Sequence, residues 1–258
     1  MVRPTTTNFT KFKGLKLQVN NMSWKKKIAI IILLIFVAGL LFVAYEYQTT
    51  TSAENILQGD HNILILCADP SEKRPGIGAV DMAFVISTHD GNVVNVTPIY
   101  PHLLASPTVA PPAEVKAQGD TKLYLHDSLW WADTDYDAKV AQEIVQYNKG
   151  YKTDIVVVVT PDAVDALINA IGPIYANGTD VTNSSIAFVR NEQYNENMSR
   201  GEAVKSVMDP MISAIKDKSK FSAFLQTATT QYAMGNIVVV PKDAFVKIAI
   251  AYGFKSLL

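Results

Sequence analysis

The sequence predicts an α/β protein: a three-layer α/β/α sandwich with a mixed central sheet, preceded by one transmembrane helix. Two continuous apolar runs of strand length, residues 62–67 and 154–160, indicate strands covered on both faces. Segments with apolar residues at helical spacing alternate with the strands, which is typical of an α/β domain. An uncharged apolar stretch at residues 28–45 supplies the transmembrane helix.

The strands come in an order that makes the sheet mixed. The two apolar runs are expected to be adjacent central strands, because only doubly covered strands tolerate such uninterrupted apolar sequence. Asp90-Gly91 is typical of a tight hairpin turn, so the strands on either side of it should be antiparallel. The other strands are predicted at residues 81–88, 92–99 and 237–240, with a short strand pair around Asn177-Gly178.

The helices are indicated by their capping residues. Thr160 is an N-cap followed by Pro at the first helical position, and Ser199 with Glu202 forms a capping box. Pro210 is expected to kink or end the helix that follows Ser199. The Pro-rich residues 100–118 predict an irregular excursion or lid. Helices are predicted at residues 136–148, 161–171, 200 onward, 221–233 and 241–252.

The N-terminal part predicts a single-pass membrane anchor. Residues 1–27 form a basic tail, residues 28–47 the transmembrane helix, residues 48–60 a polar spacer and residues 61–258 the outer domain. As a helix, the apolar stretch spans roughly 27 Å, close to the thickness of the hydrocarbon core of a bilayer. A cleaved signal peptide, with a cleavage site at Thr51-Ser52-Ala53, is the alternative, although its apolar core would be shorter.

Charge orients the anchor and excludes one class of partner. Seven basic residues and no acidic residue precede residue 28, which places the N-terminus in the cytoplasm and the outer domain in the extracytoplasmic space of the cell membrane. The remaining chain has 16 basic and 24 acidic residues, a net charge of −8. This acidic balance argues against nucleic acid as a partner. The single cysteine, Cys67, allows no intramolecular disulfide and is expected to be a buried, unreactive thiol.

The loop from Asp69 to Asp81 is the first candidate site. It follows a predicted strand and holds glycines together with charged residues. The carboxylates of Asp69 and Asp81 at its two ends can bind Mg²⁺, and the cations Lys73 and Arg74 can bind phosphate. An ordinary solvated loop with charged turn residues is the alternative interpretation. Sequence signatures for nucleotide-binding loops, nucleophile elbows and zinc proteases are absent.

A second pair of candidate residues is Arg190 and Arg200. Arg190 follows a semi-apolar segment, and Arg200 lies just inside the helix that Ser199 caps. An arginine opposes the helix dipole at a helix N-terminus unless an anion binds there, which favours a ligand-binding role. Plain surface arginines are the alternative.

The order of several segments resembles the LytR-CpsA-Psr family. The resemblance covers about residues 60–250 and is closer to a diverged branch of that superfamily, known as a domain of unknown function, which shares SEKRPGIG and a strand–helix unit ending in AIGPI. It implies a membrane-anchored extracytoplasmic domain. The segments are NILILCAD, VDMAFVIS, NVVNVTPIYP, TDIVVVVTPDAVDALINAIGPI, SSIAFVRNE and SRGEAVKSVM.

The resemblance also implies residue roles. The family proper transfers a glycopolymer from a polyprenyl-pyrophosphate carrier to the cell wall, assisted by Mg²⁺. Asp69 and Asp81 match its two acidic positions, and Arg190 and Arg200 match arginines that bind the pyrophosphate. The chain departs from the family at several positions: Ile99-Tyr100-Pro101 replaces a Pro-Arg-Asp motif, Ala79 and Asn197 replace arginines, and Gly201 replaces a glutamine.

Two functions follow from the sequence. The first is a cell-envelope phosphotransferase acting on a polyprenyl-phosphate-linked glycan, with Arg74, Arg190 and Arg200 as catalytic residues. The second is a catalytically silent envelope protein that uses the same cleft to bind a lipid-linked glycan, a polymer or a partner protein. The absent arginines favour the second function, and the retained acids Asp69 and Asp81 favour the first.

The predicted topology can be tested by cysteine labelling. In a Cys67→Ala background, a cysteine introduced near Leu258 is expected to react with a membrane-impermeant reagent added to intact cells, because the charge bias places the C-terminus outside. A cysteine introduced before residue 28 should react only after lysis and serves as the control. The reverse labelling pattern would contradict the predicted orientation.

Overall fold

A computed structural model describes residues 58–257, with gaps at 183–184, 186, 190 and 192–197. The described residues belong to one compact unit, Thr49–Leu258. The predicted transmembrane segment 28–47, the basic tail and the beginning of the spacer lie outside them. Among the helices that are described, none is long and apolar enough to cross a membrane.

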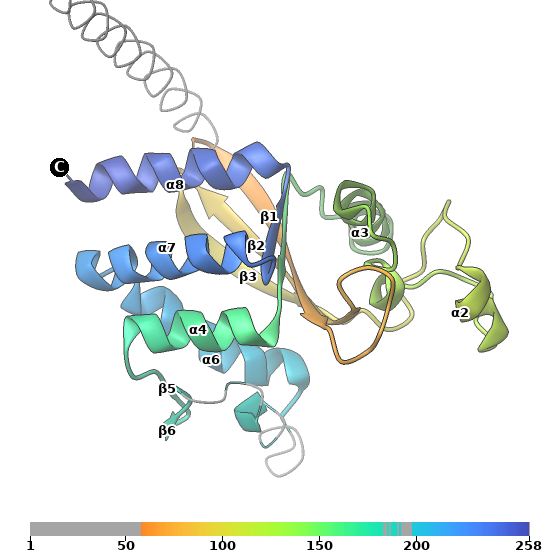
Figure 1. Cartoon of the computed structure of the whole chain (residues 1–258), viewed down its shortest axis with the longest axis horizontal. Helices are drawn as coiled ribbons and strands as arrows, with labels where there is room; N and C mark the ends of the chain where they lie inside the picture. The colour runs from red at the N-terminus through yellow and green to blue at the C-terminus, as the bar shows by residue number, and fades with distance from the viewer. Residues whose placement is uncertain (1–57, 183–184, 186, 190, 192–197, 258) are drawn as a thin grey trace, which may run out of the picture. The chain divides into compact units, whose positions relative to one another are not determined.

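The centre of the fold is a mixed five-stranded sheet with the order β3-β2-β1-β4-β7 (Figure 1). β1 and β4 pair in parallel, so the two apolar runs are adjacent, as predicted. The pairs β1–β2, β2–β3 and β4–β7 are antiparallel, which confirms a mixed sheet. The strands are β1 (Asp60–Asp69), β2 (Ala79–His89), β3 (Asn92–Ile99), β4 (Ile155–Val159) and β7 (Ile237–Val240).

Helices cover both faces of this sheet. Alternate residues of β1 point to opposite sides: Leu64 and Leu66 pack with α3 (Thr134–Lys149) in one buried cluster. Ile63 packs with the other cluster, which contains buried residues of α4 (Pro161–Ile171), α7 (Lys218–Ala233) and α8 (Lys242–Leu257). Burial on both faces explains why these strands have no polar alternation.

Two tight turns form where the sequence predicts them. Asp90 and Gly91 both have positive φ, as a two-residue hairpin turn between β2 and β3 requires. Asn177 and Gly178 also have positive φ and form the turn between the short strands β5 (Tyr175–Ala176) and β6 (Thr179–Asp180). In both turns the backbone geometry selects residues that tolerate the left-handed region.

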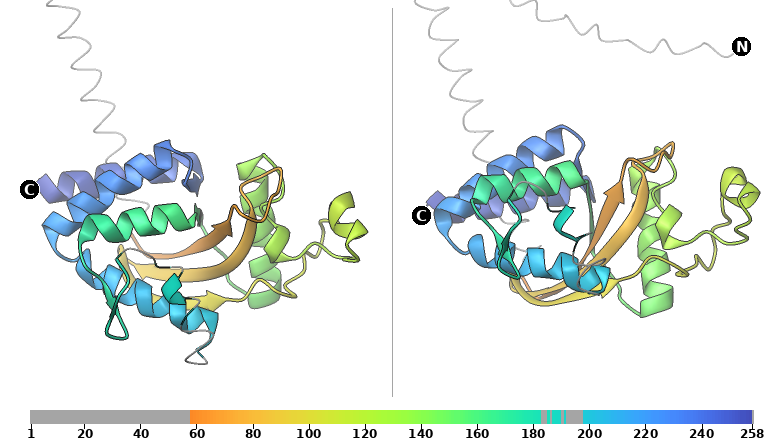
Figure 2. Two further views of the ribbon diagram at one scale, coloured as in Figure 1. Left: turned by 60° about the horizontal axis from the view of Figure 1, so that its bottom comes forward. Right: turned by 90° about the horizontal axis from the view of Figure 1, so that it is seen from below.

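The structure adds detail to the sequence predictions in two segments. Of the two predicted effects of Pro210, a kink or a helix end, the structure excludes the end, because α6 (Arg200–Ala214) continues through the proline. The Pro-rich excursion contains a short helix, α2 (Ala113–Ala117), which projects away from the sheet (Figures 1 and 2). Downstream of α2, Leu123 and Leu125 anchor the excursion in the core.

α6 lies along the edge strand β3 (Figure 2). Its N-terminus begins with the predicted capping box, in which Ser199 Oγ accepts from the Glu202 backbone N–H and Glu202 accepts from the Ser199 N–H. Gly201 is buried in this contact, and a Cβ there would lie 2.8 Å from both the Tyr100 hydroxyl oxygen and the Pro98 Cβ. The absence of a side chain therefore lets the helix start approach the end of β3 closely.

The buried sheet position of β4 gives the first structural prediction. Val156→Asp is expected to lower the free energy of unfolding by several kcal/mol or abolish folding, because Val156 is fully buried between strands and α3 and an unpaired carboxylate there is strongly penalised. Denaturant unfolding of purified protein measures the effect. Val94→Asp on the edge strand, where Val94 is 63% exposed, is the matched control and should change stability by less than about 0.5 kcal/mol. Equal stability of both variants would contradict the assignment.

Asp137 in the first turn of α3 predicts a pH dependence of stability. Burial raises the pKa of this carboxyl to about 7, and the Asp133 carboxylate adds to the increase, although the Trp131 backbone N–H donates to Oδ1 and opposes it. Since the unfolded pKa is about 3.9, the native state holds a proton between about pH 4 and pH 7 that the unfolded state has lost. Stability should therefore fall as the pH rises through this window, by up to about 4 kcal/mol at about 1.4 kcal/mol per pKa unit.

Asp137→Asn is expected to remove this part of the pH dependence, as measured by the free energy of unfolding at pH 5 and pH 8. The comparison between the two proteins is needed because other groups titrate in the same range. Hydrogen bonding to Asp60, for example, raises the pKa of the exposed His89. Parallel pH profiles for wild type and variant would show that Asp137 stays ionised in the folded protein.

Candidate functional site

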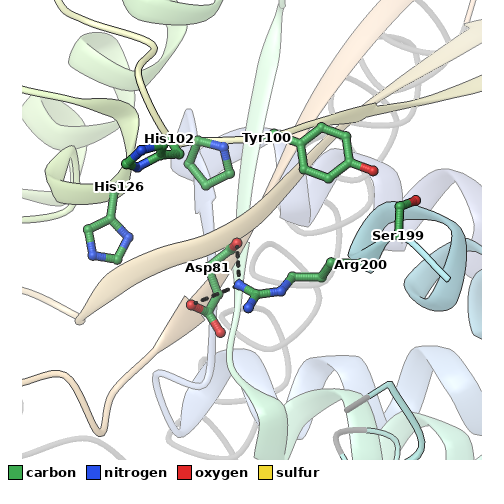
Figure 3. Close-up of a pocket in the computed structure, with 7 residues that line it drawn as sticks. Asp81, Tyr100, His102, His126, Ser199 and Arg200 are labelled. Atoms are coloured by element: carbon green, nitrogen blue, oxygen red, sulfur yellow. Dashed lines mark hydrogen bonds and ion pairs between the residues drawn. The ribbon is translucent and has the colours of Figure 1, made fainter. Parts of the chain in front are cut away.

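A pocket of about 470 Å³ lies at the edge of the sheet where β2 begins and β3 ends (Figure 3). Three separate parts of the chain meet there: the strands β2 and β3 with the residues after them, the short 3₁₀ helix η2 (Leu125–Asp127), and the N-terminus of α6. The lining residues are Asp81, Tyr100, Pro101, His102, His126, Ser199 and Arg200.

The antiparallel pairing brings these segments to one edge. β1 ends at Asp69, β2 starts at Ala79 beside it, and β3 ends at Ile99 on the far side of β2. A bulge interrupts the β1–β2 ladder, since Cys67 pairs with Met82 and Ala68 with Val80. Asp81 is the extra residue of this bulge, and bulges of this kind redirect side chains at the rims of sheets.

Asp81 and Arg200 form the central contact of the pocket (Figure 3). Arg200 Nη1 lies 3.5 Å from Asp81 Oδ1 and donates to the Asp81 backbone carbonyl oxygen at 3.3 Å. Both side chains are about two-fifths exposed, at 43% for Asp81 and 42% for Arg200. The pair joins residues 119 positions apart and leaves both charged groups accessible to a ligand in the pocket.

A cluster of three carboxylates adjoins this pair. One carboxylate oxygen from each of Asp69, Glu72 and Asp81 can be chosen so that all three lie within 4.8 Å of one another. The structure thus brings together Asp69 and Asp81, the two predicted metal ligands, and adds Glu72. Several oxygen ligands at this spacing suit a hard divalent cation such as Mg²⁺, and such a cation would offset the mutual repulsion of the acids.

Arg74 occupies a different setting from the open loop that the sequence indicates. Its guanidinium forms an ion pair with the buried Asp127, with Nη2 2.9 Å from Oδ1, and lies 3.3 Å from Glu72 Oε2. It also sits over the Trp130 ring, 5.2 Å from the ring centroid. The side chain is only 15% exposed, so Arg74 ties the loop to the rest of the domain, next to the acid cluster.

Of the other two predicted phosphate-binding residues, Lys73 does not line the pocket. Lys73 is exposed, and its backbone carbonyl accepts from Arg74 Nη1 at 3.1 Å. Arg190 lies outside the described residues. Its neighbour Val189 packs on the third buried cluster, which contains Phe188, Val207 and residues of α4.

Five pocket residues were not identified from the sequence as site residues: Tyr100, Pro101, His102, His126 and Ser199. His126 Nε2 lies 3.3 Å from Glu72 Oε2, and its Nδ1 is 3.0 Å from the Val80 carbonyl oxygen. Single histidines and a tyrosine in a Pro-rich segment show no pattern in the sequence. The capping role of Ser199 was visible, but its place beside the end of β3 depends on tertiary packing.

Cys67 borders this site without taking part in it. Burial raises the pKa of its thiol to about 12, and the Asp81 carboxylate adds to the increase. The group is therefore a neutral thiol at physiological pH, in line with the unreactive cysteine that the sequence predicts. Charge in the pocket and the acid cluster comes from the carboxylates and Arg200.

Comparison with known proteins identifies a family and a fold. Residues 58–194 match the family described as "Protein of unknown function (DUF4012)". A comparison with curated protein sequences found no significant match. Among solved structures, gbs0355 from Streptococcus agalactiae matches with a TM-score of 0.52 at 13% identity, covering 78% of this chain and 76% of that chain. At this identity the match shows a shared fold.

Two further structures from B. subtilis are similar at lower scores. TagV gives a TM-score of 0.48 at 14% identity, covering 78% of this chain and 82% of its own. TagU gives 0.41 at 14% identity, covering 74% and 81%.

Proposed function

The chain belongs to the DUF4012 family of proteins of unknown function, and we propose from its site that it binds the pyrophosphate of a lipid-linked glycan in cell-envelope glycopolymer assembly. One observation carries the proposal: Arg200 and Asp81, from distant segments, meet in a pocket beside a three-carboxylate cluster. A cation site next to an arginine is the combination that a pyrophosphate requires, because its oxygens bind both metal ions and guanidinium groups.

The cation of this proposal is Mg²⁺, held by Asp69 and Asp81 with Glu72. When bound, Mg²⁺ neutralises charge on phosphoryl oxygens. The net charge of −8 outside the N-terminal segment is compatible with this assignment, since an acidic surface needs local cations before it can bind a polyanion. Asp81 contacts Arg200 as well, so the same carboxylate orients the arginine toward the pocket.

Arg200 is the residue we assign to the phosphate. Its guanidinium faces the pocket from the first turn of α6, where backbone N–H groups and the helix dipole also favour an anion. Its Nη1 contacts both the carboxylate and the backbone carbonyl oxygen of Asp81, which holds the guanidinium in the pocket lining. Arg190 and Lys73 remain sequence-based candidates for further phosphate contacts.

The chemical step of the proposal is phosphotransfer. An acceptor hydroxyl would attack the glycan-bound phosphorus, the pyrophosphate bond would break, and polyprenyl monophosphate would leave. The resemblance to the LytR-CpsA-Psr family supports this step. The proposal also includes an anchor at residues 28–47 that contacts the bilayer, an N-terminus in the cytoplasm and an extracytoplasmic domain. The lipid substrate and the domain would then share one membrane surface.

A second function is favoured by the composition of the pocket wall. Tyr100 and Pro101 line the pocket where the family pattern has an arginine and an aspartate. Loss of charge-assisted donors at a pyrophosphate costs transition-state stabilisation more than ground-state binding. The alternative is therefore a catalytically silent protein that holds the lipid-linked glycan in this pocket for other proteins.

Arg200→Ala is expected to weaken binding of a polyprenyl pyrophosphate by at least about tenfold in the presence of Mg²⁺, equivalent to roughly 1.4 kcal/mol. The measurement is a calorimetric titration of the full-length protein in detergent. Arg200→Lys should restore only part of the affinity, because a lysine cannot form the forked contact.

Lys152→Ala is the matched control, because it also removes one positive charge from an exposed position. The Lys152 backbone carbonyl bonds to Asn62 near the start of β1, roughly 20 Å along the strand from Asp69 at about 3.3 Å per residue. Equal binding by wild type, Arg200→Ala and the control would contradict the site. Release of polyprenyl monophosphate in the presence of an acceptor would identify the protein as a phosphotransferase. Tight binding of the lipid without such release would identify it as the catalytically silent protein.

A further inference from the structure

Arg74 links the acid cluster to a buried part of the domain. Its Nε and Nη2 both contact Asp127 Oδ1, at 3.0 and 2.9 Å, and Nη2 also lies 3.3 Å from Glu72 Oε2. The aspartate side chain is 8% exposed, and the guanidinium rests on the face of Trp130. One planar group therefore makes contacts in three directions, which a guanidinium can do and an ammonium cannot.

The loop that holds Glu72 is fixed against the same segment. The Gly76 backbone N–H donates to the Trp130 carbonyl oxygen at 2.8 Å. A Cβ at Gly76 would lie 2.3 Å from the carbonyl oxygens of Leu129 and Trp131, so only glycine allows this approach. Backbone packing and the Arg74 ion pair together hold the loop on residues 127–131.

The position of Glu72 depends on these contacts. Arg74 and His126 both approach its Oε2, each at 3.3 Å, and one carboxylate oxygen of Glu72 lies within 4.8 Å of carboxylate oxygens of Asp69 and Asp81. A glutamate in a flexible loop loses rotamer freedom when it joins a site and is repelled by nearby carboxylates. The Arg74 guanidinium, held in place beside Oε2, restricts the Glu72 side chain and offsets the carboxylate repulsion before any metal binds.

We propose that Arg74 is a positioning residue: it orients Glu72 as the third carboxylate of the cation site and does not itself contact the phosphate. The inference rests on the proposed function, which includes the cation site. Arg74 does not line the pocket, and moving its guanidinium into the pocket would leave the buried Asp127 unpaired, which is strongly unfavourable. The ion pair and the stacking on Trp130 thus keep Arg74 in place while Arg200 faces the pocket.

The test is a titration of full-length protein in detergent with Mn²⁺, whose free ion is measured by electron paramagnetic resonance. Arg74→Lys keeps the positive charge and loses the forked contacts, so it isolates orientation from charge. We expect Arg74→Lys and Glu72→Gln each to weaken Mn²⁺ binding about tenfold, as partners of metal ligands commonly do. The double variant should be no weaker than the weaker single variant, because both changes act through one carboxylate.

Six outcomes are informative. Non-additive losses with unchanged affinity in Lys152→Ala support the inference. Additive losses, wild-type Mn²⁺ affinity in Arg74→Lys, or wild-type affinity in Glu72→Gln overturn it. If Mn²⁺ binds wild type and Asp81→Asn equally well, the cation site of the proposed function is wrong. If the wild-type protein binds no Mn²⁺, the cation site of the proposed function and the positioning role of Arg74 are both wrong. Should Arg74→Lys fail to fold by circular dichroism, Asp127→Asn takes its place with the same expected loss.

Discussion

The parallel pairing of β1 with β4 is the constraint on which the rest of the domain depends. Parallel strands need a crossover connection, and this one carries the chain from β3 through the Pro-rich excursion and α3 before it reaches β4. Both strands are apolar on both faces, so each face has to be covered: α3 covers one, and α4, α7 and α8 cover the other. The positions of α3, α4, α7 and α8 around the sheet follow from that requirement.

The pocket is a consequence of the same arrangement. The bulge that leaves Asp81 without a ladder partner lies at the end of β1, where the sheet stops and side chains of several segments can meet. α6 reaches this edge because Gly201 permits contact with Tyr100. A Cβ at position 201 would lie 2.8 Å from the Tyr100 hydroxyl oxygen and from the Pro98 Cβ, so a larger side chain would not fit the present helix approach. Gly201 and Tyr100 are thus one packing feature.

The charged groups of the site divide into two sets with different surroundings. Arg74 and Asp127 are mostly buried and pair with each other, whereas Arg200 and Asp81 are partly exposed at the pocket. A buried pair rigidifies its neighbourhood at a high cost of disruption, while an exposed pair contributes little to stability and can exchange partners with a ligand. The acid cluster lies between the two sets and is bounded by both.

Much of the fold was accessible from sequence because its signals are local. Unbroken apolar runs predicted β1 and β4 as neighbours, Asp90-Gly91 and Asn177-Gly178 predicted the turns, and the capping box predicted the start of α6. For Pro210 the sequence left a kink and a helix end open, and the structure decided against the end, since α6 contains the proline. In the site, the sequence singled out Asp69, Asp81 and Arg200, since charged residues at strand and helix ends are visible as a pattern.

The sequence by itself therefore determined the α/β alternation, the hairpin and the helix caps, and it supplied the charged residues predicted to bind a cation and a phosphate. Only the tertiary structure decided which of those residues meet. It placed Arg200 on Asp81 across 119 residues and added Glu72 to the acids, and it turned Arg74 toward Asp127 and Trp130. Periodicity and capping act over a few residues of one segment, whereas the partner of a charged side chain is set by how separate segments pack.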